Sequence, residues 1–224
     1  NSNFRMGEVP DPKYKILNTK YKILVIEADE HFASFLNYWP KIIVLTTIEA
    51  DHLDYWKNLK NLLKGFQKYI THIPQDGTLV LNKNDKNIKK IIDTKYKILN
   101  TKYYSLEQPE AKKLRKLLKV PGEHNVSNAL AVLAVARVLG IKDATSFKAL
   151  GEFHGTWRRF EVFKLKTTLR QSSGQANHKL YTLVSDYGHH PTEVLVTVQA
   201  ARGKWPNKKI WLVFQPHQYQ RTFY

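Results

Sequence analysis

Short apolar runs alternate with longer stretches in which apolar residues recur at helical spacing along most of the chain. The runs that predict strands are Ile23–Glu27, Ile42–Thr46, Thr78–Leu81, Leu180–Ser185 and Ile210–Phe214. The stretches that predict helices are Tyr55–Tyr69, Glu110–Leu118, Asn125–Leu139, Thr145–Leu150 and Pro191–Ala201. This alternation is typical of a layered α/β protein, so we expect that fold class.

Two connecting features refine this expectation. Gly140 follows the helix at Asn125–Leu139 and is predicted to end it, because glycine readily adopts the left-handed conformation found just past a helix. A strand is also expected after Arg159, and the polar segment Leu169–His178 is expected to be the exposed loop of a hairpin.

The nonapeptide KYKILNTKY occurs twice, at Lys13–Tyr21 and at Lys95–Tyr103. Structural repeats recur at a fixed period and stack several copies into a shared core, which two isolated copies cannot do. We interpret them as DNA-level repeats inserted at tolerated positions; the alternative is a functional element.

The composition limits the classes of protein to consider. The chain has 224 residues, 42% of them hydrophobic, which is enough to form a core. No apolar run is long enough for a membrane span and no signal-peptide pattern is present, so we expect a cytoplasmic protein without membrane contact. Because the chain has no cysteine, a bound metal would need oxygen and imidazole ligands.

The net charge of +17 raises the possibility of a nucleic-acid partner. The lysines are scattered, however, and no RNA-binding or helix-turn-helix signature is present. A solvated lysine surface is the favoured interpretation, an anionic ligand is the second, and nucleic acid is the least favoured.

Acidic residues and a histidine follow two of the predicted strands. Glu27, Asp29 and Glu30 come at the end of the first, and His52 comes shortly after the second. The first group alone would more often be a solvated acidic turn. Two successive strands are expected to bring these groups to one edge of a sheet, where ligands bind in open α/β folds and where carboxylates could hold Mg²⁺.

Four further groups could bind a ligand. Asn125 and Asn128 lie on one face of a helical first turn, where they could contact a purine or simply cap the helix. Arg158 and Arg159 could bind phosphate or form an ion pair between domains. The other two are the strings SDYGHHPTE at 185–193, whose paired histidines could bind a metal, and FQPHQYQRT at 214–222.

These strings, in this order, resemble the Mur ligase family: EADE at 27–30, TTIEADHLD at 46–54, GEHNVSNA at 122–129, DYGHHPTE at 186–193 and FQPHQYQRT at 214–222. The resemblance implies an incomplete central ATPase-type domain at 1–153, followed by the beginning of a Rossmann-like C-terminal domain at 154–224. Its cofactors would be ATP and Mg²⁺.

The resemblance also implies roles for individual residues. The metal ligands would be Glu27 and His52. The ATP contacts would be His124, Asn125, Asn128, Arg159 and Asp186. The substrate contacts would be Tyr187, His189 and Arg221, and the catalytic residues His189, His217 and Arg221. Ser185 and Gln218 replace an aspartate and an arginine of the family pattern, and the lost guanidinium should weaken binding of an anionic group.

Within the family, the strings fit best the branch that joins L-alanine to UDP-N-acetylmuramate in peptidoglycan precursor synthesis. Its reaction passes through an acyl phosphate. No GxxxxGK[ST] string occurs in the 224 residues, although the family carries this P-loop upstream of EADE. We therefore expect an incomplete fragment, for which a separate chain could supply the P-loop and N-terminal domain. A self-sufficient ligase, an inactive or partner-dependent fragment, and a basic anion- or nucleic-acid-binding module remain the alternatives.

Overall fold

The centre of the molecule is a three-stranded parallel sheet. The computed structural model describes residues 4–6, 23–92, 100–170 and 176–216. Strands β3 (Ile42–Leu45), β4 (Thr78–Asn82) and β5 (Thr101–Tyr104) form this sheet in the order β3-β4-β5. The parallel sheet between helices confirms the predicted α/β class.

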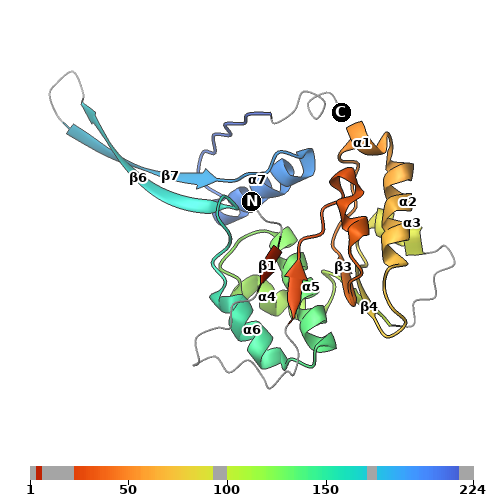
Figure 1. Cartoon of the computed structure of the whole chain (residues 1–224). Helices are drawn as coiled ribbons and strands as arrows, with labels where there is room; N and C mark the ends of the chain where they lie inside the picture. The colour runs from red at the N-terminus through yellow and green to blue at the C-terminus, as the bar shows by residue number, and fades with distance from the viewer. Residues whose placement is uncertain (1–3, 7–22, 93–99, 171–175, 217–224) are drawn as a thin grey trace.

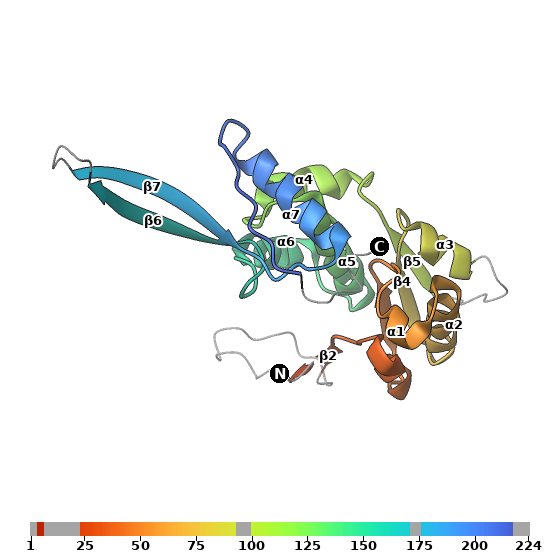
Figure 2. The same cartoon turned by 90° about the horizontal axis from the view of Figure 1, so that it is seen from above.

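Helices cover both faces of the sheet, so the central part has three layers (Figures 1 and 2). On one face, Leu79 and Leu81 pack in a core with the 3-10 helix η1 (His31–Asn37) and the helices α2 (Leu59–Ile70) and α3 (Lys86–Ile92). On the other face, Val80 packs against α4 (Pro109–Leu117) and α5 (Glu123–Val138), with α6 (Asp143–Glu152) beside them. Strand β4 is therefore buried on both faces, as expected for the middle of a parallel sheet.

The predicted helix Tyr55–Tyr69 is in fact two helices, α1 (Leu53–Trp56) and α2. The break comes at Lys57, whose φ of 68° is not helical. Asn58 then starts α2 as its N-cap, because its side-chain oxygen accepts a hydrogen bond from the Asn61 N–H at 3.0 Å. None of the helices in the described residues is long and apolar enough to cross a membrane.

The end of α5 matches the sequence prediction. Gly140 has a φ of 73°, which is the left-handed conformation expected there. Its N–H donates to the Arg137 carbonyl at 3.1 Å, and the Ile141 N–H donates to the Ala136 carbonyl at 2.8 Å. These two bonds form a Schellman-type end that satisfies carbonyl groups of the last turn.

Strand β5 and helix α3 were not predicted. Strand β5 includes Thr101, Lys102 and Tyr103, which are the last residues of the second KYKILNTKY copy. These last residues pair with β4 in the central sheet, so the end of this copy is part of the fold, and the interpretation of the copies as DNA-level repeats inserted at tolerated positions stays a prediction. The first copy lies outside the described residues.

Strand β2 (Leu24–Ile26) does not lie beside β3, so the expectation of a shared sheet edge is wrong. It pairs antiparallel with β1 (Phe4–Met6). The Val25 side chain is 73% exposed, whereas an inner strand of a parallel sheet would be covered on both faces.

The C-terminal part begins with a long antiparallel hairpin that projects from the rest of the molecule (Figure 1). Strand β6 (Glu161–Arg170) pairs with β7 (Ala176–Ser185) over its full length. The loop predicted at Leu169–His178 is therefore shorter than expected, because backbone pairing continues into this polar segment. Helix α7 (Pro191–Lys204) follows the hairpin and packs against α5.

The predicted strand Ile210–Phe214 is wrong, because residues 210–216 form neither a strand nor a helix. No β-strand of the described part pairs with this segment. Val213 is 95% exposed there. A strand needs a neighbour to receive its backbone hydrogen bonds, so the apolar run alone could not form one.

Arg137 joins the ends of three helices and gives the first prediction. Its guanidinium contacts the carboxylates of Glu110 and Asp143, at 2.5 and 2.8 Å, and hydrogen bonds from Arg137 hold the pKa of both carboxyls below their usual range. This stabilisation is complete at neutral pH and is lost as the pH falls below the usual carboxyl range, through the lowered pKa values of the two groups. We expect Arg137→Met to make the urea midpoint less dependent on pH between 6 and 3. Arg202→Met is the control, since Arg202 donates only to the Lys208 carbonyl among its side-chain bonds in the described part. An unchanged pH dependence in Arg137→Met would contradict the assignment.

Candidate active site

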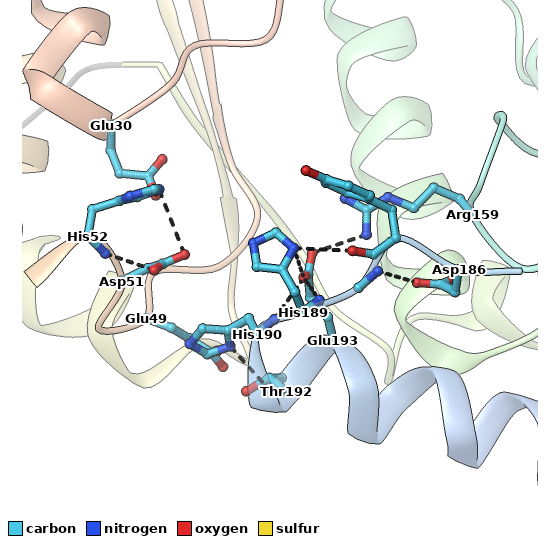
Figure 3. A network of polar contacts seen from close by, with 12 residues as sticks. Glu30, Glu49, Asp51, His52, Arg159, Asp186, His189, His190, Thr192 and Glu193 are labelled. Carbon is cyan, nitrogen blue, oxygen red and sulfur yellow. Dashed lines mark hydrogen bonds and ion pairs between the residues drawn. The ribbon is translucent and has the colours of Figure 1, made fainter. Parts of the chain in front are cut away.

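The segments that follow β2 and β3 converge, although the two strands are not neighbours. Asp29, Glu30 and His52 each offer one ligand atom, and these atoms lie within 4.8 Å of one another. The His52 Nε2 lies 3.8 Å from the carboxylates of Glu30 and Asp51 (Figure 3). Two carboxylates with one imidazole form a donor set that fits a hard divalent cation such as Mg²⁺.

Backbone contacts hold this group in place. The Trp56 indole N–H donates to the Glu30 carbonyl at 3.1 Å, which ties the residues after β2 to α1. His52 has a φ of 52°, a costly conformation for a residue with a Cβ, and its N–H donates to Asp51 Oδ1 at 2.8 Å. The predicted ligand Glu27 is exposed and belongs to neither metal-compatible group of the described residues, so its role stays a prediction.

A second group forms where the N-terminus of α5 meets the turn after β7. His124 is half-buried, and its Nδ1 is buried without a hydrogen-bond partner among the described residues. Burial lowers the pKa of His124; the nearby Asp186 carboxylate opposes this shift and Arg159 adds to it. Three residues predicted to contact ATP therefore lie together: His124, Asp186 and Arg159. The lowered pKa favours the neutral form of the His124 imidazole.

Asp186 also connects two backbone segments. Its Oδ2 accepts a hydrogen bond from the Phe160 N–H at 2.8 Å, and its Oδ1 accepts one from the Gly188 N–H at 2.7 Å. Asn125 has a comparable structural contact, because its Nδ2 donates to the Pro121 carbonyl at 2.6 Å. Asn128 is exposed in the next turn of α5.

Glu193, which we did not single out from the sequence, holds the beginning of α7. Its carboxylate accepts hydrogen bonds from the N–H groups of His189 and His190 at 3.0 and 3.2 Å, and pairs with Arg159 at 3.1 Å. Burial raises the pKa of Glu193, but the two N–H groups and Arg159 together lower it by more, so the net shift of the pKa is downward. The order His-Pro-Thr-Glu could have identified this carboxylate, since proline at the first turn and glutamate at its third residue mark a helix start.

The two predicted substrate contacts in the described part lie beside this turn. The exposed Tyr187 ring packs edge-to-face with His189 at 5.3 Å between centroids, and Arg158 lies over the same ring at 4.8 Å. Ser185, at the end of β7, pairs with Glu161 of β6. The other two predicted residues, His217 and Arg221, lie outside the described residues, as does Gln218.

Glu49 connects the two groups. Its Oε2 lies 3.2 Å from the Nδ1 of His190, so the segment that carries His52 contacts the start of α7 (Figure 3). The same Nδ1 lies 3.3 Å from the Thr192 N–H. One ring nitrogen cannot donate to Glu49 and accept from Thr192 at once. Nδ1 therefore serves one contact at a time: it donates to Glu49 when it carries a proton and accepts from Thr192 when it does not.

Comparison with known proteins identifies the family. Residues 8–136 match the family described as the Mur ligase middle domain. The chain belongs to the Mur ligase family. It is 39% identical to the UDP-N-acetylmuramate–L-alanine ligase of Paraburkholderia phytofirmans, over 89% of this chain and 46% of that protein. The ligase of the same name from Burkholderia mallei is 36% identical over the same shares. This Mur ligase chain thus spans about half the length of the curated relatives it matches.

Solved Mur ligases have a similar fold. A murein peptide ligase from Psychrobacter arcticus superposes with a TM-score of 0.52 and 20% identity, over 83% of this chain and 39% of that one. MurF from Acinetobacter baumannii gives a TM-score of 0.52 and 17% identity, over 79% of this chain and 39% of that one. At this identity the likeness supports the fold of the Mur ligase chain.

The contact between Glu49 and His190 gives the second prediction. In a double-mutant cycle of Glu49→Ala and His190→Ala, we expect a coupling of about 0.5–1 kcal/mol in the free energy of unfolding, because one partner is well shielded from water. Urea denaturation of the four proteins measures it. Lys41 and Asp76 are the control pair; they are highly exposed, so solvent screens their attraction and their coupling should be smaller. Equal coupling in both cycles would show that the Glu49 contact is an ordinary surface pair.

Proposed function

We propose that this Mur ligase chain takes part in the ATP- and Mg²⁺-dependent joining of L-alanine to UDP-N-acetylmuramate, in the synthesis of peptidoglycan precursors. One observation carries the proposal. The Glu49 carboxylate contacts His190 at the start of α7, which joins the segment carrying His52 of the cation-compatible group to the turn that carries Asp186 (Figure 3). The 39% identity to a relative of that name supports the choice of substrates.

Mg²⁺ would bind His52 together with Asp29 and Glu30, with Glu27 as a further proposed ligand. The donor chemistry fits, because Mg²⁺ takes few protein ligands and completes its shell with phosphate oxygens and water. When bound, the ion supplies positive charge that stabilises the transferring phosphoryl group.

ATP would lie along the first turn of α5 and the turn after β7. The Nδ1 of His124 has no hydrogen-bond partner among the described residues, and the amide of Asn128 is exposed, so both would bond to ATP. The Asn125 amide already donates to the Pro121 carbonyl and would contact ATP through its oxygen. Arg159 pairs with Glu193 through one nitrogen, and its remaining N–H groups can donate to phosphate. Asp186 retains lone pairs for a ribose hydroxyl.

The proposed reaction has two steps. The carboxylate of UDP-N-acetylmuramate attacks the γ-phosphorus of ATP, and ADP leaves, which gives an acyl phosphate. The amine of L-alanine then attacks the acyl carbon, and phosphate leaves as the amide forms. Tyr187 and His189 would orient these substrates, with His217 and Arg221 contributing from outside the described residues. The reaction would take place in the cytoplasm.

Phosphate release tests the proposal. The chain is assayed at high concentration with ATP, Mg²⁺, UDP-N-acetylmuramate and L-alanine, alone and mixed with the part of the Paraburkholderia phytofirmans relative that the chain does not match. We expect release in the mixture that stops when L-alanine or UDP-N-acetylmuramate is omitted, since a separate chain would supply the P-loop. Absence of release from both the chain and the mixture would refute the proposal.

Asn128 provides a specific check of the ATP contacts. We expect Asn128→Ala to raise the KM for ATP about two- to tenfold in the active mixture, through loss of one or two neutral hydrogen bonds. Asn207→Ala is the matched control, because Asn207 is also an exposed asparagine but lies after α7, away from α5. An unchanged KM in Asn128→Ala would remove this residue from the nucleotide site.

A further inference from the structure

His52 belongs to two different groups of possible metal ligands. The first, with Asp29 and Glu30, offers two carboxylates and one imidazole. The second consists of His31, His52 and Asp54, whose ligand atoms also lie within 4.8 Å of one another. This second group offers two imidazoles and one carboxylate, and the two donor sets favour different metals.

We propose that His31, His52 and Asp54 form a binding site for a borderline divalent transition metal such as Zn²⁺. Two imidazoles and one carboxylate are a common ligand set for Zn²⁺ and for other first-row transition metals, which leave further positions open to water. Mg²⁺ prefers a shell of oxygen atoms and fits this group poorly. The site shares His52 with the proposed Mg²⁺ site, but it goes beyond the proposed ligase function because it requires neither ATP nor the other substrates.

The local backbone brings the three side chains together. His31 is the first residue of η1, and its N–H donates to Asp29 Oδ1 at 2.8 Å. His52 precedes α1 as its N-cap, and Asp54 lies in the first turn of that helix. The Trp56 indole, which donates to the Glu30 carbonyl, holds α1 against the start of η1. Both imidazoles are partly buried, while Asp54 is exposed and leaves the site open to an entering ion.

The two imidazole rings lie in a stack, with Phe32 stacked on the far side of His31. The centroids of His31 and His52 are 4.2 Å apart, and those of His31 and Phe32 are 4.0 Å apart. The planes of the two imidazoles are only 15° apart, so their nitrogen lone pairs do not yet converge. Binding of one ion therefore requires the rings to turn about their Cβ–Cγ bonds, and this turn should change the ring-proton resonances of both histidines.

Metal titration of the untagged chain, stripped with a chelator, tests the site. Calorimetry with ZnCl₂ should show one Zn²⁺ per chain. His31→Phe keeps an aromatic ring in the stack but removes the nitrogen, and Asp54→Asn keeps the shape but removes the charge. We expect each to weaken Zn²⁺ binding about tenfold or more, since even indirect supports of a metal site cost that much.

Two variants serve as controls. His72→Phe removes a histidine that stacks on Trp39, outside the site, and should leave Zn²⁺ binding unchanged. Asp29→Asn keeps the Oδ1 that accepts from the His31 N–H but removes the charge, so it should change Zn²⁺ binding less than threefold but weaken the binding of MgCl₂, which reports on the proposed Mg²⁺ site. Absence of Zn²⁺ binding, or equal affinity in His31→Phe and the parent, would overturn the proposal. So would equal losses in His31→Phe and His72→Phe, because the effect would then not belong to this group.

Discussion

Leu81→Ala is expected to lower the free energy of unfolding by about 2–5 kcal/mol. Leu81 lies in the middle strand of the central sheet and has no exposed surface. Its removal leaves a cavity among Leu45, Ile48 and the other residues of the core beneath η1 and α2. The surrounding helices can close such a cavity only in part, so the loss includes both transfer of the methyl groups and unfilled space. Urea denaturation followed by circular dichroism measures the change.

Leu195→Ala is the matched control for this substitution. Leu195 lies in α7 and its side chain is 56% exposed, so its removal should change the free energy of unfolding by less than about 0.5 kcal/mol. A small loss in Leu81→Ala, similar to that in Leu195→Ala, would mean that the three-stranded sheet is not the centre of the cooperative fold.

The parts of the fold predicted best from the sequence are those with an apolar pattern on a buried element. Strands β3 and β4 and helix α5 have such patterns, and each lies within a few residues of its prediction. Strand β5 was missed because Lys102 and Tyr103 face solvent, so pairing with β4 fixes it more than its own side chains do. The wrong strand at Ile210–Phe214 shows the opposite case, in which an apolar run finds no neighbour to pair with.

The candidate site was predicted as a set of residues but not as an arrangement. The sequence indicated that carboxylates after β2 would meet His52, yet it wrongly placed the two strands in one sheet. Neighbours in space such as Glu49 and His190 could not be paired from the sequence, because their contact depends on how α7 packs beside the central part. His31 was not singled out from the sequence for the same reason. Only its position in space, stacked on the His52 ring, makes it a candidate metal ligand.

The second large effect is expected at Gly122, where Gly122→Ala should lower the free energy of unfolding by about 2–5 kcal/mol. Gly122 has a φ of 104°, which a residue with a Cβ rarely adopts. A Cβ at this position would also lie 2.5 Å from the His124 ring and 3.1 Å from the Cβ of Ala200 in α7. The His124 ring would have to move, and Ala200 would have to shift by a few tenths of an ångström, so the packing between α5 and α7 should weaken.

Two other glycines separate strain from crowding in this prediction. Gly140 has a φ of 73° with open space around it, so Gly140→Ala should cost only the backbone strain, about 1–2 kcal/mol. Gly203 lies in α7 with neither a positive φ nor a near neighbour, and Gly203→Ala should stabilise the protein by up to about 1 kcal/mol. Urea denaturation should show the largest loss of stability in Gly122→Ala, a smaller loss in Gly140→Ala and no loss in Gly203→Ala. If Gly122→Ala costs no more than Gly140→Ala, the close approach of Gly122 to the His124 ring and to Ala200 of α7 does not limit the packing of the two parts of the site.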